Sequence, residues 1–206
     1  MKRSGRVGGR AVRTVDIHAH IAADVAEAVA GTAYEARNTA NLRQYGSIDE
    51  ARIARMDRMG IDVQVVSVNP FWYEMDRTLA GRFIAAQNAR LAEMTRGSER
   101  FYAMATVSLQ HPDLAVEQLR AAKALGLRGV SLGCTIAGEE LASRRFDPFW
   151  KCCEDLDTLV FLHPQEAVQN TGIGRRVQGA GSLANVIGNP LETTFALSHL
   201  IFEGTL

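Results

Sequence analysis

The sequence lacks both a charge imbalance and long apolar runs. Its 206 residues carry 23 Lys and Arg against 23 Asp and Glu, so the formal net charge is zero. A neutral chain has no overall field that would recruit nucleic acid or an anionic membrane. The longest apolar runs are only a few residues, whereas a membrane-spanning helix needs about 20. These absences argue against nucleic acid and membranes as partners and favour a small-molecule ligand.

Cysteine is also scarce. The chain has three cysteines, Cys134, Cys152 and Cys153, and no C-x-x-C pair. An odd number without paired spacing does not predict a disulfide framework, which favours a reducing compartment. We therefore expect a cytoplasmic protein.

The N-terminus lacks acidic and apolar segments. Its first thirteen residues contain five basic side chains and no acidic one: Lys2, Arg3, Arg6, Arg10 and Arg13. No apolar core of a secretory signal is present, although organelle transit peptides share this Arg-rich, acid-poor composition. We expect residues 1–12 to form a disordered tail ahead of the first strand.

Short apolar runs alternate with longer segments of helical spacing through the rest of the chain. The predicted strands are 12–17, 62–68, 101–107, 128–132 and 159–163. The predicted helices are one that starts at a Ser47 to Glu50 capping box and stops at Gly60, then 76–96, 112–125, and two that begin at 147 and 189. The polar stretch between the first strand and the first of these helices is predicted to be irregular.

Five successive strand–helix units predict an α/β fold with a parallel sheet, because parallel strands need crossovers of about a dozen residues. The alternatives are an open doubly wound sheet and a closed (β/α)8 barrel. The first strand is not followed by a Gly-rich phosphate turn, which weakens the dinucleotide-binding version of the open sheet. A (β/α)8 barrel takes about 250 residues. The prediction is therefore one domain over residues 1–206, an incomplete TIM-type barrel.

Histidines follow two of the predicted strands. His18 and His20 end the first strand in an H-x-H pattern, and His163 ends the fifth. Residues i and i+2 of a strand share a face, and the carboxyl ends of parallel strands gather at one rim. Three imidazoles at one rim suit zinc, iron, nickel or manganese. The alternative is that His18 and His20 lie in a surface turn and that His163 is a hydrogen-bonded core residue.

Other residues near this rim are weaker candidates. Asp16 lies two residues before His18 and is expected on the same face, as a metal ligand, a hydrogen-bond acceptor for an imidazole or a structural acid. Arg43 lies in the irregular stretch, from which a guanidinium could pair with a substrate carboxylate, or it is a surface residue. His111 and His199 are expected in a turn and on a helix packing face.

These residues and motifs together resemble the decarboxylase-type amidohydrolases, similar to aminocarboxymuconate semialdehyde decarboxylase. The resemblance runs from Thr14 onward through the segments 15–20 (VDIHAH), 55–62 (RMDRMGID), 160–164 (VFLHP) and 188–194 (GNPLETT). It implies that His18, His20 and His163 bind a divalent metal, usually zinc and in some members manganese. Members of the family also use an acid/base histidine after the sixth strand and an aspartate ligand after the eighth, and neither is present in this sequence.

The resemblance implies a metal-dependent, nonoxidative decarboxylase of an aromatic or unsaturated carboxylic acid, with Arg43 as the candidate carboxylate anchor. Two alternatives stay open. The same metal rim could activate water against an ester, lactone or amide, which would make the enzyme a hydrolase. The chain could also be an inactive fragment, since the acid/base histidine and the aspartate are missing. An open barrel would expose apolar faces, which makes a homo-oligomer a plausible assembly.

Overall fold

The computed structural model describes residues 5–69, 71–165, 174–178 and 180–206. Its central feature is a five-stranded parallel sheet in the order β3-β4-β5-β6-β9. The strands are β3 (Val15–His20), β4 (Val63–Ser67), β5 (Phe101–Ala105), β6 (Gly129–Gly133) and β9 (Leu159–His163). Sequential order with parallel pairing is the pattern of the first five strands of a barrel, as the sequence predicts.

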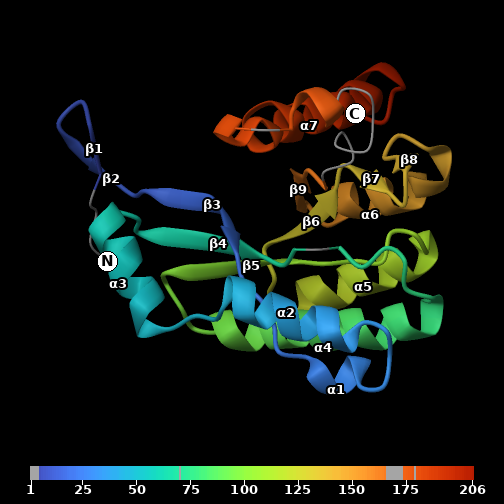
Figure 1. The fold of residues 1–206 in the computed structure, drawn as a ribbon, viewed down its shortest axis with the longest axis horizontal. Helices are drawn as coiled ribbons and strands as arrows, with labels where there is room; N and C mark the ends of the chain where they lie inside the picture. Colours follow the sequence, from blue (N-terminus) through green and yellow to red (C-terminus); the bar gives the residue numbers. More distant parts are fainter. Residues whose placement is uncertain (1–4, 70, 166–173, 179) are drawn as a thin grey trace.

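Helices connect the strands and cover one face of the sheet (Figure 1). The larger ones are α3 (Glu50–Met59), α4 (Arg77–Thr95), α5 (Pro112–Ala124), α6 (Asp147–Asp155) and α7 (Asn189–Phe202). Each starts within a few residues of its predicted position. The cap of α3 differs from the prediction: Asp49, not Ser47, accepts the hydrogen bond from the Arg52 amide at 2.7 Å. Gly60 ends this helix with φ 70°, as predicted for a glycine stop.

The stretch expected to be irregular after the first strand is helical. It forms α1 (Ala26–Val29) and α2 (Glu35–Tyr45). Helix α2 is polar along most of its length, so it has no apolar stripe that would reveal its period in the sequence. This difference matters because α2 borders the candidate site.

The N-terminal segment also differs from the disordered tail expected for residues 1–12. Residues Gly5–Val7 (β1) and Arg10–Val12 (β2) pair as an antiparallel hairpin. Gly8 and Gly9 lie at its turn with φ of 54° and 80°, a conformation that favours glycine. Residues 1–4 are outside the described part of the chain.

Short strands and helical turns complete the described elements. A small antiparallel pair, β7 (Thr135–Ile136) and β8 (Glu139–Glu140), follows β6. The turn η1 (Arg144–Phe146) leads into α6, and η3 (Gly174–Arg176), η4 (Ala180–Ser182) and the π-helical turn η5 (Ala184–Gly188) lead into α7. None of the helices in the described ranges has the length and apolar character that a membrane span requires.

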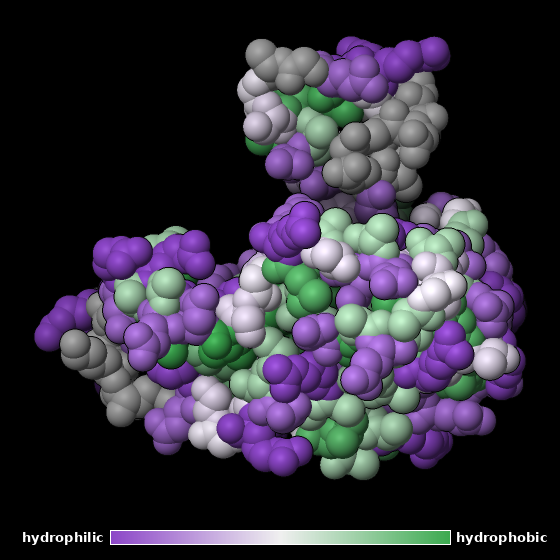
Figure 2. Space-filling model, turned by 60° about the horizontal axis from the view of Figure 1, so that its bottom comes forward, coloured by the Kyte–Doolittle hydropathy of each residue, from purple (hydrophilic) through white to green (hydrophobic). Residues whose placement is uncertain are grey.

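The sheet leaves its two edge strands, β3 and β9, without a further neighbour among the described residues. Helix α7 packs Ala196 and Leu200 into the core beside α6 but leaves other large apolar side chains exposed. On the face shown in Figure 2, hydrophobic and hydrophilic side chains are interspersed. The exposed apolar residues of α7 are Phe195, Leu197, Ile201 and Phe202. The structure is thus an incomplete TIM barrel, as predicted, with apolar surface on its last helix.

Candidate metal centre

Strand β3 delivers two histidines to its carboxyl end, and a β-bulge sets their direction. Asp16 pairs with Gln64, whereas Ala19 pairs with Val66, so β3 has one residue more than β4 in this interval. An extra residue breaks the regular alternation of faces and re-aims the side chains that follow it. After the bulge, His20 lies opposite Ser67. Strand β3 therefore does not place Asp16 and the histidines on one face as the sequence alternation suggests.

His163 comes from the other edge of the sheet. It ends β9, opposite Gly133 of β6. In a flat sheet, strands four positions apart would be about 19 Å from each other. Yet the Nε2 atoms of His163 and His20 are 3.1 Å apart, so the sheet must curl until its two edge strands face each other. The barrel-like curvature of the sheet therefore brings His163 to His20 and so forms the histidine cluster.

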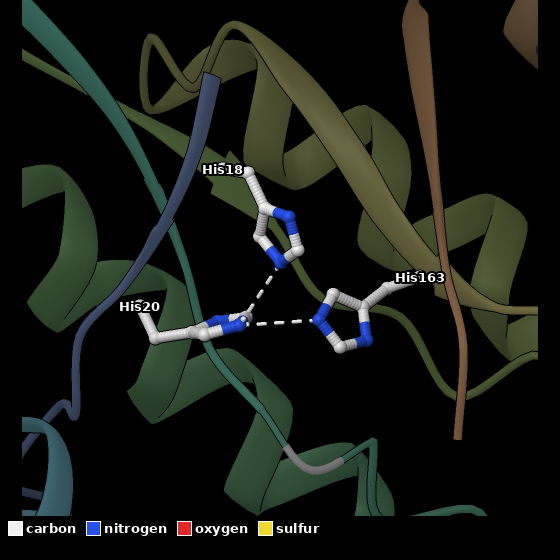
Figure 3. A group of neighbouring side chains, drawn as sticks. All are labelled: His18, His20 and His163. Carbon is white, nitrogen blue, oxygen red and sulfur yellow. Dashed lines mark hydrogen bonds between the residues drawn. The ribbon is translucent and has the colours of Figure 1, made fainter. Parts of the chain in front are cut away.

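The three imidazoles point their Nε2 atoms toward one another (Figure 3). His18 Nε2 lies 3.2 Å from His20 Nε2, and all three ligand atoms lie within 4.8 Å of one another. Two nitrogens bound to one tetrahedral ion at about 2.0–2.1 Å would be about 3.3 Å apart. The spacing therefore fits ligands of a single ion. This is the only group of at least three candidate ligands found among the described residues.

The protonation states of the cluster also suit a metal. Burial, followed by the neighbouring His163 and His18, lowers the pKa of His20 to about 4. Burial likewise lowers the pKa of His163. Nδ1 of His163 donates to the Pro164 carbonyl at 2.6 Å, which leaves the Nε2 lone pair directed at the cluster. At neutral pH the rings of His20 and His163 are therefore uncharged, which is the form that coordinates a metal.

The lowered pKa of His20 predicts acid sensitivity of the metal-free chain. Above pH 6.5 the ring is neutral in both states. Below it the unfolded chain binds a proton that the folded chain excludes, so stability falls as pH drops toward about 4. We expect a loss of roughly 1–2 kcal/mol once solvent screening of this partly exposed ring is allowed for. Denaturant unfolding at pH 7 and 4.5 measures it.

The matched variant for this prediction is His20→Gln, which keeps a polar side chain but does not titrate. Its unfolding free energy should fall less between pH 7 and pH 4.5 than that of the unchanged chain. Equal losses in both proteins would contradict the assignment of the effect to His20.

A cavity of about 1010 Å³ adjoins the three histidines. Helix α2 forms one wall through Arg37, Asn41, Gln44 and Tyr45. These positions recur at helical spacing, so they share one face of α2. Tyr45 lies beside His20, with ring centroids 5.4 Å apart. Other lining residues come from the end of β9, from η5 and from the start of α7, including Asn185, Asn189 and Thr193.

Arg43 does not line this cavity. It is exposed and lies two residues after Asn41 on α2, which turns it by about 200° away from the cavity-lining face. The guanidinium that lines the cavity belongs to Arg37. Arg37 lies 4.7 Å from the centre of the Trp72 ring and forms an ion pair with Glu74. Sequence reasoning missed Arg37 because it read this segment as irregular, and a helical reading would have grouped Arg37 with Asn41 and Gln44.

The other candidate residues make contacts outside the histidine cluster. Both carboxylate oxygens of Asp16 accept hydrogen bonds, from the Gln64 amide at 2.9 Å and from the His18 backbone at 3.2 Å. His111 precedes α5 and its Nε2 lies 3.2 Å from the Met75 carbonyl. His199 is on α7, where Glu203 raises its pKa through a hydrogen bond. None of these three belongs to the histidine cluster.

Known proteins are similar to this chain in sequence and in fold. The family model described as "Amidohydrolase" matches residues 15–206. The chain is 28% identical over 159 residues to 2-amino-3-carboxymuconate-6-semialdehyde decarboxylase of Dictyostelium discoideum, covering 75% of this chain and 43% of that protein. It is 33% identical over 128 residues to γ-resorcylate decarboxylase of Rhizobium radiobacter, covering 57% and 39%.

A solved structure shares the fold. It is 5-carboxyvanillate decarboxylase from Novosphingobium aromaticivorans, complexed with manganese and 4-hydroxy-3-methoxy-5-nitrobenzoic acid. The TM-score is 0.70 at 24% identity, over 98% of this chain and 64% of that one. The chain thus spans about two fifths of the curated relatives that it matches and less than two thirds of this structure.

Proposed function

This chain belongs to the amidohydrolase family, and from that premise we propose that it forms the metal-binding part of a carboxy-lyase. The enzyme would remove CO2 nonoxidatively from an aromatic or unsaturated carboxylic acid. The two curated relatives described above are named as decarboxylases of such acids, which supports this reaction over ester, lactone or amide hydrolysis.

The observation that supports the proposal best is the position of the three histidines on the wall of a large polar cavity. His18, His20 and His163 direct their Nε2 atoms to one point, and the adjoining cavity measures about 1010 Å³. Ligand pockets commonly measure about 300–1,000 Å³, so an aromatic acid has room beside the ion. These features favour direct contact between a bound carboxylic acid and the metal.

The roles within the site follow from these contacts. We assign the metal to His18, His20 and His163, where a divalent ion would act as a Lewis acid toward the substrate or lower the pKa of a water molecule. Pro164 fixes the tautomer of His163, and the amides of Asn69 and Asn189 on the cavity wall can orient polar substituents. The family resemblance assigns the acid/base histidine and a further aspartate ligand to later strands, so this chain supplies only part of the catalytic machinery.

We propose zinc as the resident ion, with manganese as the competitor. Three imidazole ligands are typical of zinc sites, whereas manganese favours more oxygen ligands. The related 5-carboxyvanillate decarboxylase contains manganese. Additional oxygen ligands from the substrate or from later strands would move the preference toward manganese.

We assign the carboxylate anchor to Arg37 in place of Arg43. Its guanidinium lines the cavity and is held by Trp72 and Glu74. Arginine has five N–H donors, and the Glu74 carboxylate does not use all of them, so donors remain for a substrate carboxylate. Arg37→Met should weaken binding of 2,6-dihydroxybenzoate to the zinc-loaded chain about 10-fold or more, as expected for a charge-assisted hydrogen bond. Isothermal titration measures the affinity.

Arg43→Met is the matched control for Arg37→Met, because both remove a guanidinium from α2. Arg43 is exposed and outside the cavity, so this variant should bind the acid as the unchanged chain does. A larger loss in Arg43→Met than in Arg37→Met would return the anchor to Arg43.

The reaction itself is tested by product analysis. A protein that carries this segment together with the remaining barrel strands is incubated with 2,6-dihydroxybenzoate and, separately, with aryl esters and lactones. We expect metal-dependent release of CO2 from the acid with no consumption of water. Hydrolysis of the esters or lactones without CO2 release from the acid would favour the hydrolase instead.

We further propose a cytoplasmic location and self-association. Cys134, Cys152 and Cys153 are all free, which fits a reducing compartment. Exposed Phe195 and Phe202 on α7 provide apolar surface that a second copy could cover. Sedimentation of the purified chain tests the assembly: a single monomeric species would contradict it.

A further inference from the structure

A buried arginine reaches from α3 to the strand that carries the H-x-H pair. Arg52 is only 8% exposed. Its Nε donates to Gln64 Oε1 at 2.9 Å, and its terminal nitrogen donates to the His20 carbonyl at 3.0 Å. One guanidinium therefore binds both the neighbouring strand β4 and the backbone of a candidate metal ligand.

The hydrogen bonds continue from Gln64 to the other end of the bulge. Gln64 Nε2 donates to Asp16 Oδ2 at 2.9 Å, and Asp16 Oδ1 accepts the His18 backbone N–H at 3.2 Å. Arginine has only donors and an ionised aspartate only acceptors, so the Gln64 amide can satisfy both in one orientation alone. The result is an ordered chain from Arg52 through Gln64 to Asp16, with contacts to the backbone of both His18 and His20.

These contacts enclose the segment in which β3 departs from regular pairing. Without the extra residue, a strand that pairs Asp16 with Gln64 would place His18 opposite Val66 and His20 opposite Val68. Val66 and Val68 are buried in the apolar core beneath the helices. A regular strand would thus turn both imidazoles toward that core and away from His163, because a one-residue shift reverses the face of every side chain.

We infer that Arg52, Gln64 and Asp16 are positioning residues, whose task is to hold the β3 bulge so that His18 and His20 face His163. This inference rests on the proposed metal centre. Asp16 accepts a hydrogen bond from the His18 amide at the start of the bulge, and Arg52 donates one to the His20 carbonyl beyond the bulge. The three residues act through the backbone of the ligands and do not touch the ion or the substrate.

A variant pair separates positioning from general stability. Arg52→Lys keeps the charge but loses the guanidinium, whose nitrogens donate to both Gln64 and the His20 carbonyl. Gln64→Met keeps the volume but loses the hydrogen bonds to Arg52 and Asp16. The matched control is Arg100→Lys. Arg100 makes the same kind of contacts, to the Asp62 and Ile61 carbonyls at 2.7 and 2.9 Å, just before β4 begins, and these two carbonyls belong neither to the bulge nor to the histidines.

Zinc affinity of the 206-residue chain is measured by competition with a chromophoric chelator, and the Co²⁺ absorption spectrum reports coordination geometry. We expect Arg52→Lys and Gln64→Met to weaken zinc binding about 10- to 100-fold and to alter the Co²⁺ bands. Arg100→Lys should change the affinity less than about 2-fold. Zinc affinity that is unchanged in both test variants, or that falls equally in Arg100→Lys, overturns the inference while leaving the metal centre intact.

Hydrogen exchange of the His18 amide tests the same inference without metal. The amide should exchange at least 10-fold faster in Gln64→Met than in the unchanged chain, and Arg100→Lys should leave its rate within about 2-fold. If the unchanged chain binds no zinc, the metal centre fails and this exchange result alone decides whether the bulge is held as inferred. Unaltered exchange in Gln64→Met overturns it.

Discussion

Replacing His163 by alanine should lower the rate of CO2 release by about a thousandfold or more, equivalent to about 4 kcal/mol in the activation barrier. The substitution is made in a protein that contains this segment with the remaining strands of the barrel. His163 is the only candidate ligand from β9, and its Nε2 lies 3.1 Å from that of His20. Its loss leaves this segment with two ligands, both from β3, which hold an ion weakly and cannot position it against a substrate. Steady-state CO2 assays with added metal measure the effect.

His111→Ala is the control for this variant. His111 is the histidine at the start of α5, and its ring contacts the Met75 carbonyl and not the cluster. We expect its rate to stay within about 10-fold of the unchanged enzyme, because it has no contact with the reacting groups. If His163→Ala retained most of the activity, or if both variants lost it equally, the assignment of His163 to the metal would be untenable.

Gly129→Ala should destabilise the chain by roughly 2–3 kcal/mol. A Cβ at Gly129 would lie 2.6 Å from the carbonyl oxygen of Leu159 and 3.2 Å from its Cβ. These are atoms of the paired strand, so relief requires β6 and β9 to separate. The same ladder pairs Gly133 with His163, and a displaced β9 should therefore also weaken metal binding. Urea unfolding and zinc titration measure both consequences.

Gly81→Ala is the same chemical change as Gly129→Ala, but it should stabilise the chain. Gly81 lies inside α4, where an added Cβ meets no atom within 4 Å. Alanine is the better helix former, so this variant should be more stable by about 0.5–1 kcal/mol. Should Gly129→Ala unfold at the same urea concentration as the unchanged chain, the close approach of β6 and β9 would be refuted.

The order of elements could be predicted from the sequence because most of the strands are short apolar runs and the main helices have an apolar stripe. Strand β9 begins and ends at Leu159 and His163, as predicted. Helix α2 could not be predicted this way, since its sequence is polar and has no apolar stripe. The hairpin over residues 5–12 was missed for a similar reason, because Gly8 and Gly9 were read as part of a basic tail.

The meeting of His18, His20 and His163 was predictable from topology, because parallel strands bring their carboxyl ends to one rim. The bulge could not be predicted from the sequence, because it is an extra residue of β3 relative to β4 and is defined only by the pairing of the two strands. It is the reason that His18 and His20 do not share the face on which Asp16 contacts Gln64. Arg43 is the carboxylate anchor expected if this stretch is irregular. The stretch is helix α2, and this helix places Arg37, not Arg43, at the cavity.

The most direct test of the metal centre is elemental analysis of the purified 206-residue chain beside a His18→Ala, His20→Ala variant, both washed in metal-free buffer. We expect close to one zinc or manganese ion per chain, and we expect the variant to lose the ion while its secondary structure, followed by circular dichroism, is retained. Absence of metal from the unchanged chain after incubation with either ion, or equal metal in both proteins, would contradict this expectation.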